Sequence, residues 1–282
     1  MAQFAAMQST PAPAQRYDDG SGWPPVTSGL IAINVIVFLA MVFGGVSVMD
    51  PNPQELFRWG ANFGPVSLIL QPWRLLTANY IHIGILHIAL NMWGLWSLGN
   101  LAERIFGGWT YFVIYTLCGL TGSLASAWRN PPILSAGASG AIFGIAGALI
   151  AALYLGKLPF PKHAVQSTLK SLVFVAGYNL FYGAIVPGIS NSDHIGGLVC
   201  GLVLGAALAG SLTAARGVRE VWRLGVFAVA TISLFVAFIF VRNMRGYRFE
   251  ANTDSHSSRQ SLMTRASFNS ATHFQAHSGL LP

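Results

Sequence analysis

The sequence predicts an all-α integral membrane protein that crosses the bilayer several times. Of its 282 residues, 53% are hydrophobic and only 9% are charged, whereas a soluble globular domain has about 25% charged residues. The apolar residues gather in runs that suit membrane helices, which need about 20 mostly apolar residues each. The formal net charge is +7. Because the basic residues lie between the apolar runs, they indicate membrane topology rather than nucleic-acid binding.

Seven apolar runs are candidate transmembrane helices: residues 30–46, 84–101, 108–127, 138–155, 172–186, 195–212 and 224–241. The fifth run is the shortest. Residues 1–27 hold several prolines and no apolar core, so they predict a disordered, cytoplasmic N-terminus without a cleaved signal peptide. We expect residues 28–213 to form a core of six transmembrane helices, and residues 214–242 to supply a basic loop and a seventh helix. Residues 243–282 are polar and predict a disordered tail.

Two connections between the runs contain features beyond simple turns. The first, residues 47–83, is far longer than most loops, and long ordered loops are usually functional. Its Trp73 and Tyr80 suit a membrane interface. The connection before the sixth run reads VPGISNSDH, in which Ser192 or Asp193 is expected to cap the next helix.

The distribution of Lys and Arg predicts the orientation. One side of the membrane would hold Arg16, Arg104, Lys157, Lys162, Arg216, Arg219 and Arg223, and the other Arg58, Arg74 and Arg129. The positive-inside rule then places the N-terminus in the cytoplasm of a multi-pass protein, which we expect in the plasma membrane. The basic residues after the seventh run oppose this rule, because they would follow on the outer side: Arg242, Arg245 and Arg248. Either the seventh run exports them or it does not cross the membrane.

A few polar residues lie inside the apolar runs, where they are costly and usually functional. His87, Ser139 and His194 each lie near the start of an even-numbered run, and even-numbered runs cross in the same direction. These side chains should therefore share one depth, close to the outer face. His87 and Asn91 are four residues apart, so they project from the same side of a helix. We interpret the set as one site that opens to the outer side.

Lines of small residues predict close contact between the fourth and sixth helices. Glycines at every fourth position follow His194 along the sixth run: Gly197, Gly201 and Gly205. The fourth run has a matching line: Gly140, Gly144 and Ala148. Such faces let helix backbones approach closely. The Ser139 hydroxyl is then expected to reach His194, and Phe143, one turn later, to stack on the His194 ring.

This constellation suits nucleophilic catalysis. A serine hydroxyl becomes a good nucleophile when a base takes its proton, and His194 can do so. The developing oxyanion needs fixed donors. The Ser139 backbone N–H lies at a helix start, where such groups lack partners within the helix, and His87 and Asn91 can add side-chain donors. The residues therefore predict a serine hydrolase site with catalytic Ser139 and His194, oxyanion stabilisation by His87 and Asn91, and neither cofactor nor metal.

Other chemistries fit the residues less well. The metal motif H-E-x-x-H is absent, and the spacing of His82 and His87 would splay them around a helix; we expect His82 to be structural. An aspartyl mechanism would need two carboxyl groups together, but Asp193 and Glu103 lie at the ends of different runs. The motif around Ser139 also lacks the second glycine of G-x-S-x-G. We expect Asp193 to cap a helix rather than to complete a catalytic triad.

The chain resembles the rhomboid family of intramembrane serine proteases from about Val26 to Gly205. Several ordered motifs carry the resemblance: Trp73-Arg74 in the first loop, H-x-x-x-N at His87 and Asn91, Glu103 followed by Gly107, G-x-S-G ending at Gly140, and H-x-x-G-x-x-x-G from His194 to Gly201. Asp193 departs from the small residue that usually precedes the histidine.

The resemblance implies a six-helix core, with the seventh helix of the six-plus-one variants, and cleavage of other membrane proteins within or beside their spans. By the same resemblance Ser139 is the nucleophile, His194 the base, and His87 and Asn91 stabilise the oxyanion. The expected partners are single-span transmembrane substrates and the lipid bilayer, with no nucleic acid and no metal. Two alternatives stay open: an inactive rhomboid-like protein that binds membrane helices, and a small-solute transporter, although the repeat symmetry typical of transporters is not evident.

Overall fold

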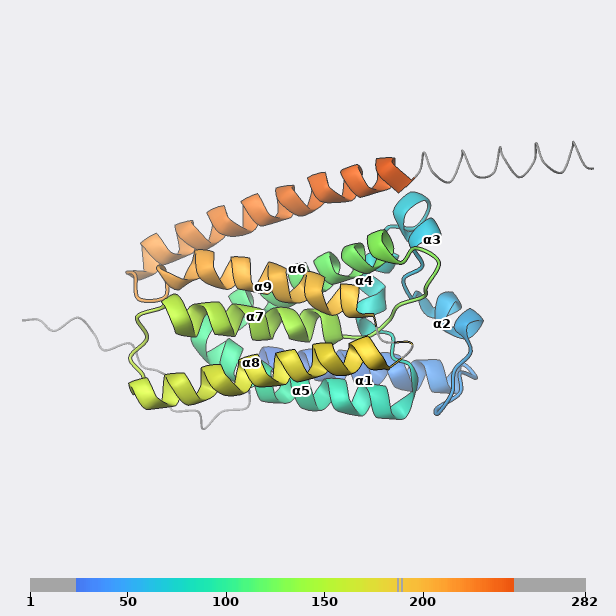
Figure 1. Cartoon of the computed structure of the whole chain (residues 1–282), viewed down its shortest axis with the longest axis horizontal. Coiled ribbons are helices and arrows are strands. Elements are labelled where there is room, and N and C mark those ends of the chain that lie inside the picture. The colour runs from blue at the N-terminus through green and yellow to red at the C-terminus, as the bar shows by residue number, and fades with distance from the viewer. Residues whose placement is uncertain (1–23, 187, 189, 246–282) are drawn as a thin grey trace, which may run out of the picture.

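The computed structural model describes residues 24–186, 188 and 190–245, and nearly all of them belong to one bundle of helices (Figure 1). In chain order the elements are α1 (Pro25–Phe43), α2 (Pro53–Trp59), α3 (Gly64–Ile69), α4 (Arg74–Thr77), the 3-10 helix η2 (Ala78–Tyr80), α5 (Gly84–Phe106), α6 (Gly108–Arg129), α7 (Ser139–Leu155), α8 (Lys162–Ile185) and α9 (Asn191–Ala209). A further helix, Arg216–Arg245, ends the described part. The expectations for residues 1–23 and 246–282 lie outside it.

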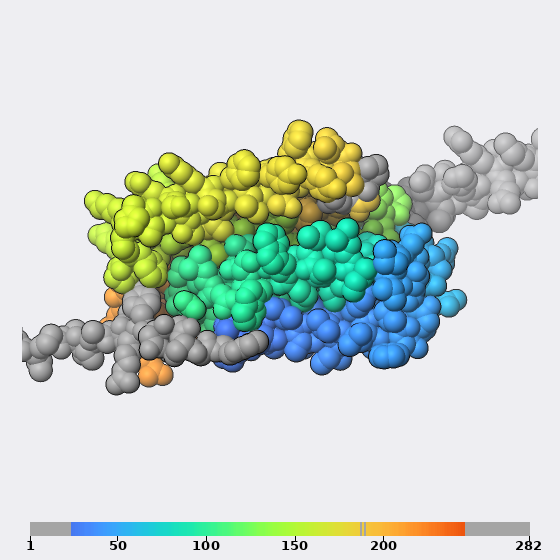
Figure 2. Space-filling model, turned by 90° about the horizontal axis from the view of Figure 1, so that it is seen from below, coloured from blue at the N-terminus to red at the C-terminus, as the bar shows by residue number. Residues whose placement is uncertain are grey.

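The helices fit an integral, multi-pass membrane protein. Within the described residues, α1, α6, α9 and the helix Arg216–Arg245 are each long and apolar enough to cross a bilayer. The segment Arg74–Tyr80 and α5 qualify together, with a bend of 91° between them. The helix α7 is apolar but has 17 residues, and α8 has 24 residues. On one face of the molecule, α5 lies between α1 and α8 (Figure 2).

Each predicted apolar run overlaps one of these helices, although most boundaries differ, and three of the differences bear on the predictions. The helix α1 begins at Pro25, inside the segment expected to be disordered, because proline is well suited to the first position of a helix. The helix α8 begins at Lys162, so the fifth run is not the shortest helix. The sequence did not predict this helix start, because charged lysines interrupt the apolar pattern there. The long aliphatic part of a lysine side chain can nevertheless lie along an apolar surface. The last described helix continues past residue 242 to Arg245.

The long first connection is ordered and contains short helices of its own, as predicted. Its organiser is Arg74, whose guanidinium is buried although it is charged. Arg74 donates to Gln71 Oε1 at 2.6 Å and to the carbonyl oxygens of Phe57 at 2.6 Å and Ala61 at 3.1 Å. It also lies 3.8 Å from the centre of the Phe57 ring. These bonds tie α2 to α4, and α3 and α4 pack against α6.

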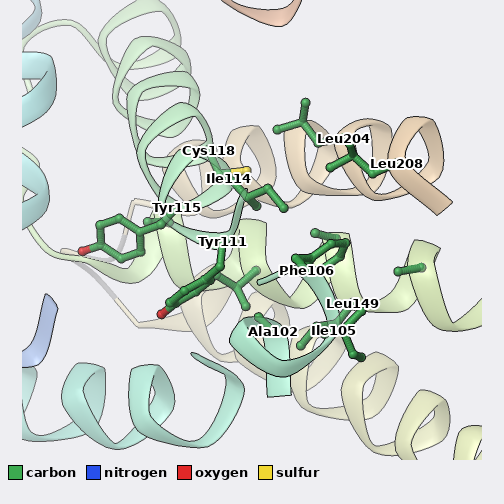
Figure 3. Close-up of a cluster of buried hydrophobic side chains, with 14 of the residues drawn as sticks. Ala102, Ile105, Phe106, Tyr111, Ile114, Tyr115, Cys118, Leu149, Leu204 and Leu208 are labelled. Atoms are coloured by element: carbon green, nitrogen blue, oxygen red, sulfur yellow. The ribbon is translucent and has the colours of Figure 1, made fainter. Parts of the chain in front are cut away.

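The centre of the bundle is formed by α5, α6, α7 and α9 (Figure 3). Its buried side chains include Phe106, Tyr111, Ile114, Cys118, Leu149, Leu204 and Leu208. The helices α7 and α9 pack most closely of all. A Cβ atom on Gly201 would meet the Gly144 carbonyl oxygen, and one on Gly197 would meet that of Gly140. The predicted contact between the two lines of small residues is therefore confirmed.

Candidate active site

Ser139 and His194 meet where α7 and α9 begin. Ser139 is the first residue of α7, and His194 lies in the first turn of α9. The distance from Ser139 Oγ to His194 Nε2 is 2.9 Å, which is a hydrogen bond. The predicted proximity of the two side chains is thus confirmed. With its proton on Nδ1, the imidazole presents a lone pair at Nε2 and can accept the serine proton.

Packing holds the His194 ring in place. The rings of Phe143 and His194 are stacked, with centroids 4.4 Å apart and planes 14° apart. His194 is buried, and its Nδ1 atom has no hydrogen-bond partner among the described residues. Consequently no third side chain orients the imidazole from its far nitrogen in this structure. The stacking against Phe143, as the sequence predicted, supplies the orientation instead.

Asp193 is buried, but it does not cap its own helix. The helix α9 begins at Asn191 and Ser190 is its N-cap residue, so the prediction that Ser192 or Asp193 caps it is wrong. The Asp193 carboxyl group instead lies against the first turn of α7, where the backbone N–H of Gly140 faces it. A Cβ atom on Gly140 would lie 2.5 Å from Asp193 Oδ2. Glycine at this position therefore makes room for the carboxyl group.

The Asp193 contact supplies a cap that α7 lacks locally. Its N-cap residue, Ala138, has no side chain that could accept a hydrogen bond. The first N–H groups of a helix need acceptors from elsewhere, and Asp193 provides one from the neighbouring helix. Asp193, which precedes His194, thus stabilises the start of α7, whose first residue is Ser139.

His87 presents a donor beside Ser139. The Ile83 backbone N–H donates to His87 Nδ1 at 3.2 Å, which leaves the ring proton on Nε2. A Cβ atom on Gly137 would lie 2.9 Å from His87 Nε2 and 3.7 Å from Ser139 Oγ. The imidazole and the hydroxyl therefore flank the same glycine, which has a φ of 131°. This conformation favours glycine, and a side chain there would also displace His87.

Asn91 lies one turn after His87 on α5, and it is buried. Its Nδ2 atom donates to the His87 carbonyl oxygen at 2.8 Å. An amide nitrogen has two protons, so one proton remains for another acceptor. The four residues predicted for the site thus come from three helices, α5, α7 and α9.

His82 has a more specific contact than the sequence suggested. Its side chain is fully buried, and its Nε2 atom accepts a long hydrogen bond, 3.5 Å, from the Ala138 backbone N–H. Its ring centre lies 5.3 Å from that of His87. His82 therefore contacts both Ala138, which precedes Ser139, and the imidazole of His87.

A network of serine hydroxyl groups, which the sequence did not predict, holds the two segments that lead into α7 and α9. Ser126 Oγ on α6 lies 3.0 Å from Ser135 Oγ and 2.9 Å from Ser190 Oγ. Ser135 precedes α7 and pairs with Asn62 through their backbones, while Ser190 is the N-cap residue of α9. The segments leading to Ser139 and His194 are therefore tied to one serine. A serine within an apolar run was the only sequence signal for this role.

Within the described residues, no three His, Cys, Asp or Glu side chains are grouped as metal ligands would be. The site instead offers a hydroxyl, an imidazole in contact with it, and neighbouring N–H donors, which are the parts needed for acyl transfer.

The comparisons with known proteins match the part of the chain that carries this site. A family model described as "Rhomboid domain" matches residues 70–211. "Rhomboid protease GluP" of Bacillus subtilis (strain 168) is 39% identical over 222 residues, which is 78% of this chain and 41% of that protein. "RHOMBOID-like protein 2" of Arabidopsis thaliana is 32% identical over 225 residues, covering 68% of this chain and 70% of that protein.

A third relative, "Rhomboid protease AarA" of Providencia stuartii, is 30% identical over 206 residues, covering 64% of this chain and 72% of that protein. The chain therefore spans less than half the length of the Bacillus relative but most of the other two.

Proposed function

This chain belongs to the rhomboid family, and we propose that it is an intramembrane serine endopeptidase that cleaves single-span membrane proteins within or beside their spans. The observation that carries the proposal is the 2.9 Å contact between Ser139 Oγ and His194 Nε2 at the start of two closely packed apolar helices. Its relatives in Bacillus subtilis and Providencia stuartii bear the name rhomboid protease. The Arabidopsis relative bears only the name RHOMBOID-like.

The proposed reaction begins when His194 Nε2 accepts the Ser139 hydroxyl proton. Oγ attacks the carbonyl carbon of the scissile peptide bond and forms a tetrahedral oxyanion. The Ser139 backbone N–H and His87 Nε2–H then donate to the oxyanion, together with the second amide proton of Asn91. The imidazolium returns its proton to the leaving nitrogen, and the C–N bond breaks to give an acyl-enzyme. Water repeats the sequence with His194 as base, which releases the acid and restores Ser139.

The membrane placement is part of the proposal. Residues 28–213 would form the catalytic core with six crossings, and the helix Arg216–Arg245 would add a seventh. With the N-terminus in the cytoplasm, the starts of α7 and α9 lie near the outer face of the plasma membrane. This depth would let water reach Ser139, which is only partly buried. Hydrolysis needs such access, since water is the second substrate.

The test uses the purified full-length protein in detergent micelles with a fluorescent single-span substrate. We expect cleavage by the wild type, and none by Ser139→Ala or His194→Ala. The matched control is Ser97→Ala, because Ser97 is an exposed serine of α5 that bonds only its own helix in the structure. A fluorophosphonate should label the wild type and Ser97→Ala but not Ser139→Ala. A folded wild type that neither reacts with the probe nor cleaves would favour the alternative of an inactive helix-binding protein.

A further inference from the structure

The last described helix is attached to the bundle near its two ends. Near its start, Trp222 Nε1 donates to the Ala207 carbonyl oxygen at 2.8 Å, and Arg223 Nη2 donates to that of Phe106 at 2.8 Å. At its end, Arg245 donates to the Trp128 carbonyl oxygen. The helix runs alongside α9 and α6 at the edge of the bundle (Figure 1).

A groove of about 1360 Å³ runs along this helix. Its walls are the facing sides of α6, α9 and the helix Arg216–Arg245, and most of the lining is aliphatic, including Ala125, Val199, Val203, Val226 and Ala230. The groove is also lined by Gly225, where a Cβ atom would meet nothing within 4 Å. Small residues therefore leave the space between the walls unfilled, while the hydrogen bonds described above hold the helix to the bundle.

An apolar groove at membrane depth is filled by hydrocarbon. Empty space would deprive its lining of dispersion contacts, and the bilayer core offers no water to occupy it. An acyl chain is flexible and can follow irregular walls between two fixed helices. The shape and the chemistry of the walls thus favour a lipid tail.

One end of the groove also suits a phosphate. Trp128 and Arg129 line the groove where α6 ends, and Arg245 reaches the Trp128 carbonyl from the other wall. A guanidinium binds phosphate oxygens in a bidentate manner, and tryptophan is typical of the membrane interface. In the predicted orientation this is the outer end of the groove. We propose that the groove is a binding site for one anionic phospholipid, with its phosphate at Arg129 and Arg245 and its acyl chains along α9.

A substrate helix is a poorer occupant of this groove. The groove is lined by Ile195, Val199 and Val203 of α9, whereas His194 and Gly197 of the same helix face α7. A span bound in the groove would be separated from Ser139 by the whole of α9. The lipid site is therefore distinct from the proposed catalytic site and does not depend on the proposed activity.

The experiment measures lipid bound to the purified full-length protein. The probes are phosphatidylglycerol and phosphatidylcholine with identical deuterated chains, quantified by mass spectrometry after detergent exchange. We expect the wild type to retain phosphatidylglycerol about tenfold more tightly, which corresponds to about 1.4 kcal/mol. Arg129→Gln should abolish this preference while still retaining phosphatidylcholine. Gly225→Phe, which fills the groove, should lower retention of both lipids about tenfold or more.

The matched control is Gly29→Phe, because Gly29 lies on α1 and a Cβ atom there also meets nothing within 4 Å. Its lipid retention should equal that of the wild type. Ala230→Leu provides a second, smaller filling variant should Gly225→Phe lose its helical circular dichroism. Wild-type retention in a folded filling variant would overturn the proposal. The proposal would also be overturned if a groove variant converted a dimer into monomers without changing the amount of bound lipid. The groove would then be an interface between two copies of this chain.

Discussion

The contact between Asp193 and Gly140 leads to a prediction that separates two roles for a carboxyl group beside a catalytic histidine. Asp193→Asn keeps an oxygen that can accept the Gly140 N–H, whereas Asp193→Ala removes it. If Asp193 holds the start of α7, the alanine variant should be much more damaging than the asparagine variant. If Asp193 oriented His194 as a triad member, both variants should be severely impaired.

The expected magnitudes follow from the buried N–H. In Asp193→Ala the Gly140 N–H loses its acceptor, which costs about 1–3 kcal/mol of stability for a buried group. In Asp193→Asn only the interaction of a charge with the helix dipole changes, which is worth about 0.3–1 kcal/mol. Ser139 precedes Gly140, so a shift of the helix start moves the nucleophile. A displacement of about 1 Å costs roughly a hundredfold in rate, and we expect that loss for alanine only.

The assay combines thermal unfolding in micelles with kcat and KM for a single-span substrate. Asp50→Asn is the matched control, because Asp50 is exposed in the first connection. We expect the melting temperature to fall in the order wild type, Asp193→Asn, Asp193→Ala, and Asp193→Asn to keep kcat within about tenfold of the wild type. Loss of the orienting carboxylate from a triad costs about 10⁴ in kcat. A folded Asp193→Asn protein with a loss of that size would refute the capping role.

The remaining predictions concern the oxyanion donors and the helix contact. His87→Phe and Asn91→Ala should each lower kcat by about a hundredfold to a thousandfold with little change in KM, and a raised KM with unchanged kcat would instead indicate a role in binding. Gly201→Ala should push α9 away from α7, abolish most activity and cost about 1–3 kcal/mol of stability, as measured by turnover and thermal unfolding. Gly177→Ala is its control, because a Cβ atom on Gly177 meets nothing within 4 Å; equal behaviour of the two variants would contradict the packing argument.

The sequence was sufficient to predict the central contact of the site. Membrane helices alternate in direction, so a side chain's place along its run predicts its depth, and this placed Ser139 and His194 at one level. Glycines at every fourth residue then predicted which faces meet. Both inferences depend on local spacing and on the constraint that a helix crosses the bilayer, which fixes much of the geometry in advance.

Other parts of the site could not be predicted, because they depend on contacts between segments without a shared local pattern. The contact of His82 with Ala138 needs the sharp bend between the segment Arg74–Tyr80 and α5. Ser126 meets Ser135 and Ser190 only once three elements have packed. A serine in an apolar run has many possible partners, and spacing along the chain does not choose between them.

The two carboxyl groups placed at the ends of predicted spans show why helix capping was misjudged. Glu103 of α5 accepts hydrogen bonds from the backbone N–H groups of Val26 and Thr27 in the first turn of α1 at 2.9 and 2.8 Å. The Asp193 carboxyl group faces the backbone N–H of Gly140 in the first turn of α7. Neither of these two helices has a capping side chain at its own N-cap position. Capping rules search the residues just before a helix, so they cannot find an acceptor on another helix. In a bilayer, a buried helix start needs such an acceptor because water is scarce there. Each cap therefore also fixes one helix against another, and at α7 this attaches the helix of the proposed nucleophile to the helix of its base.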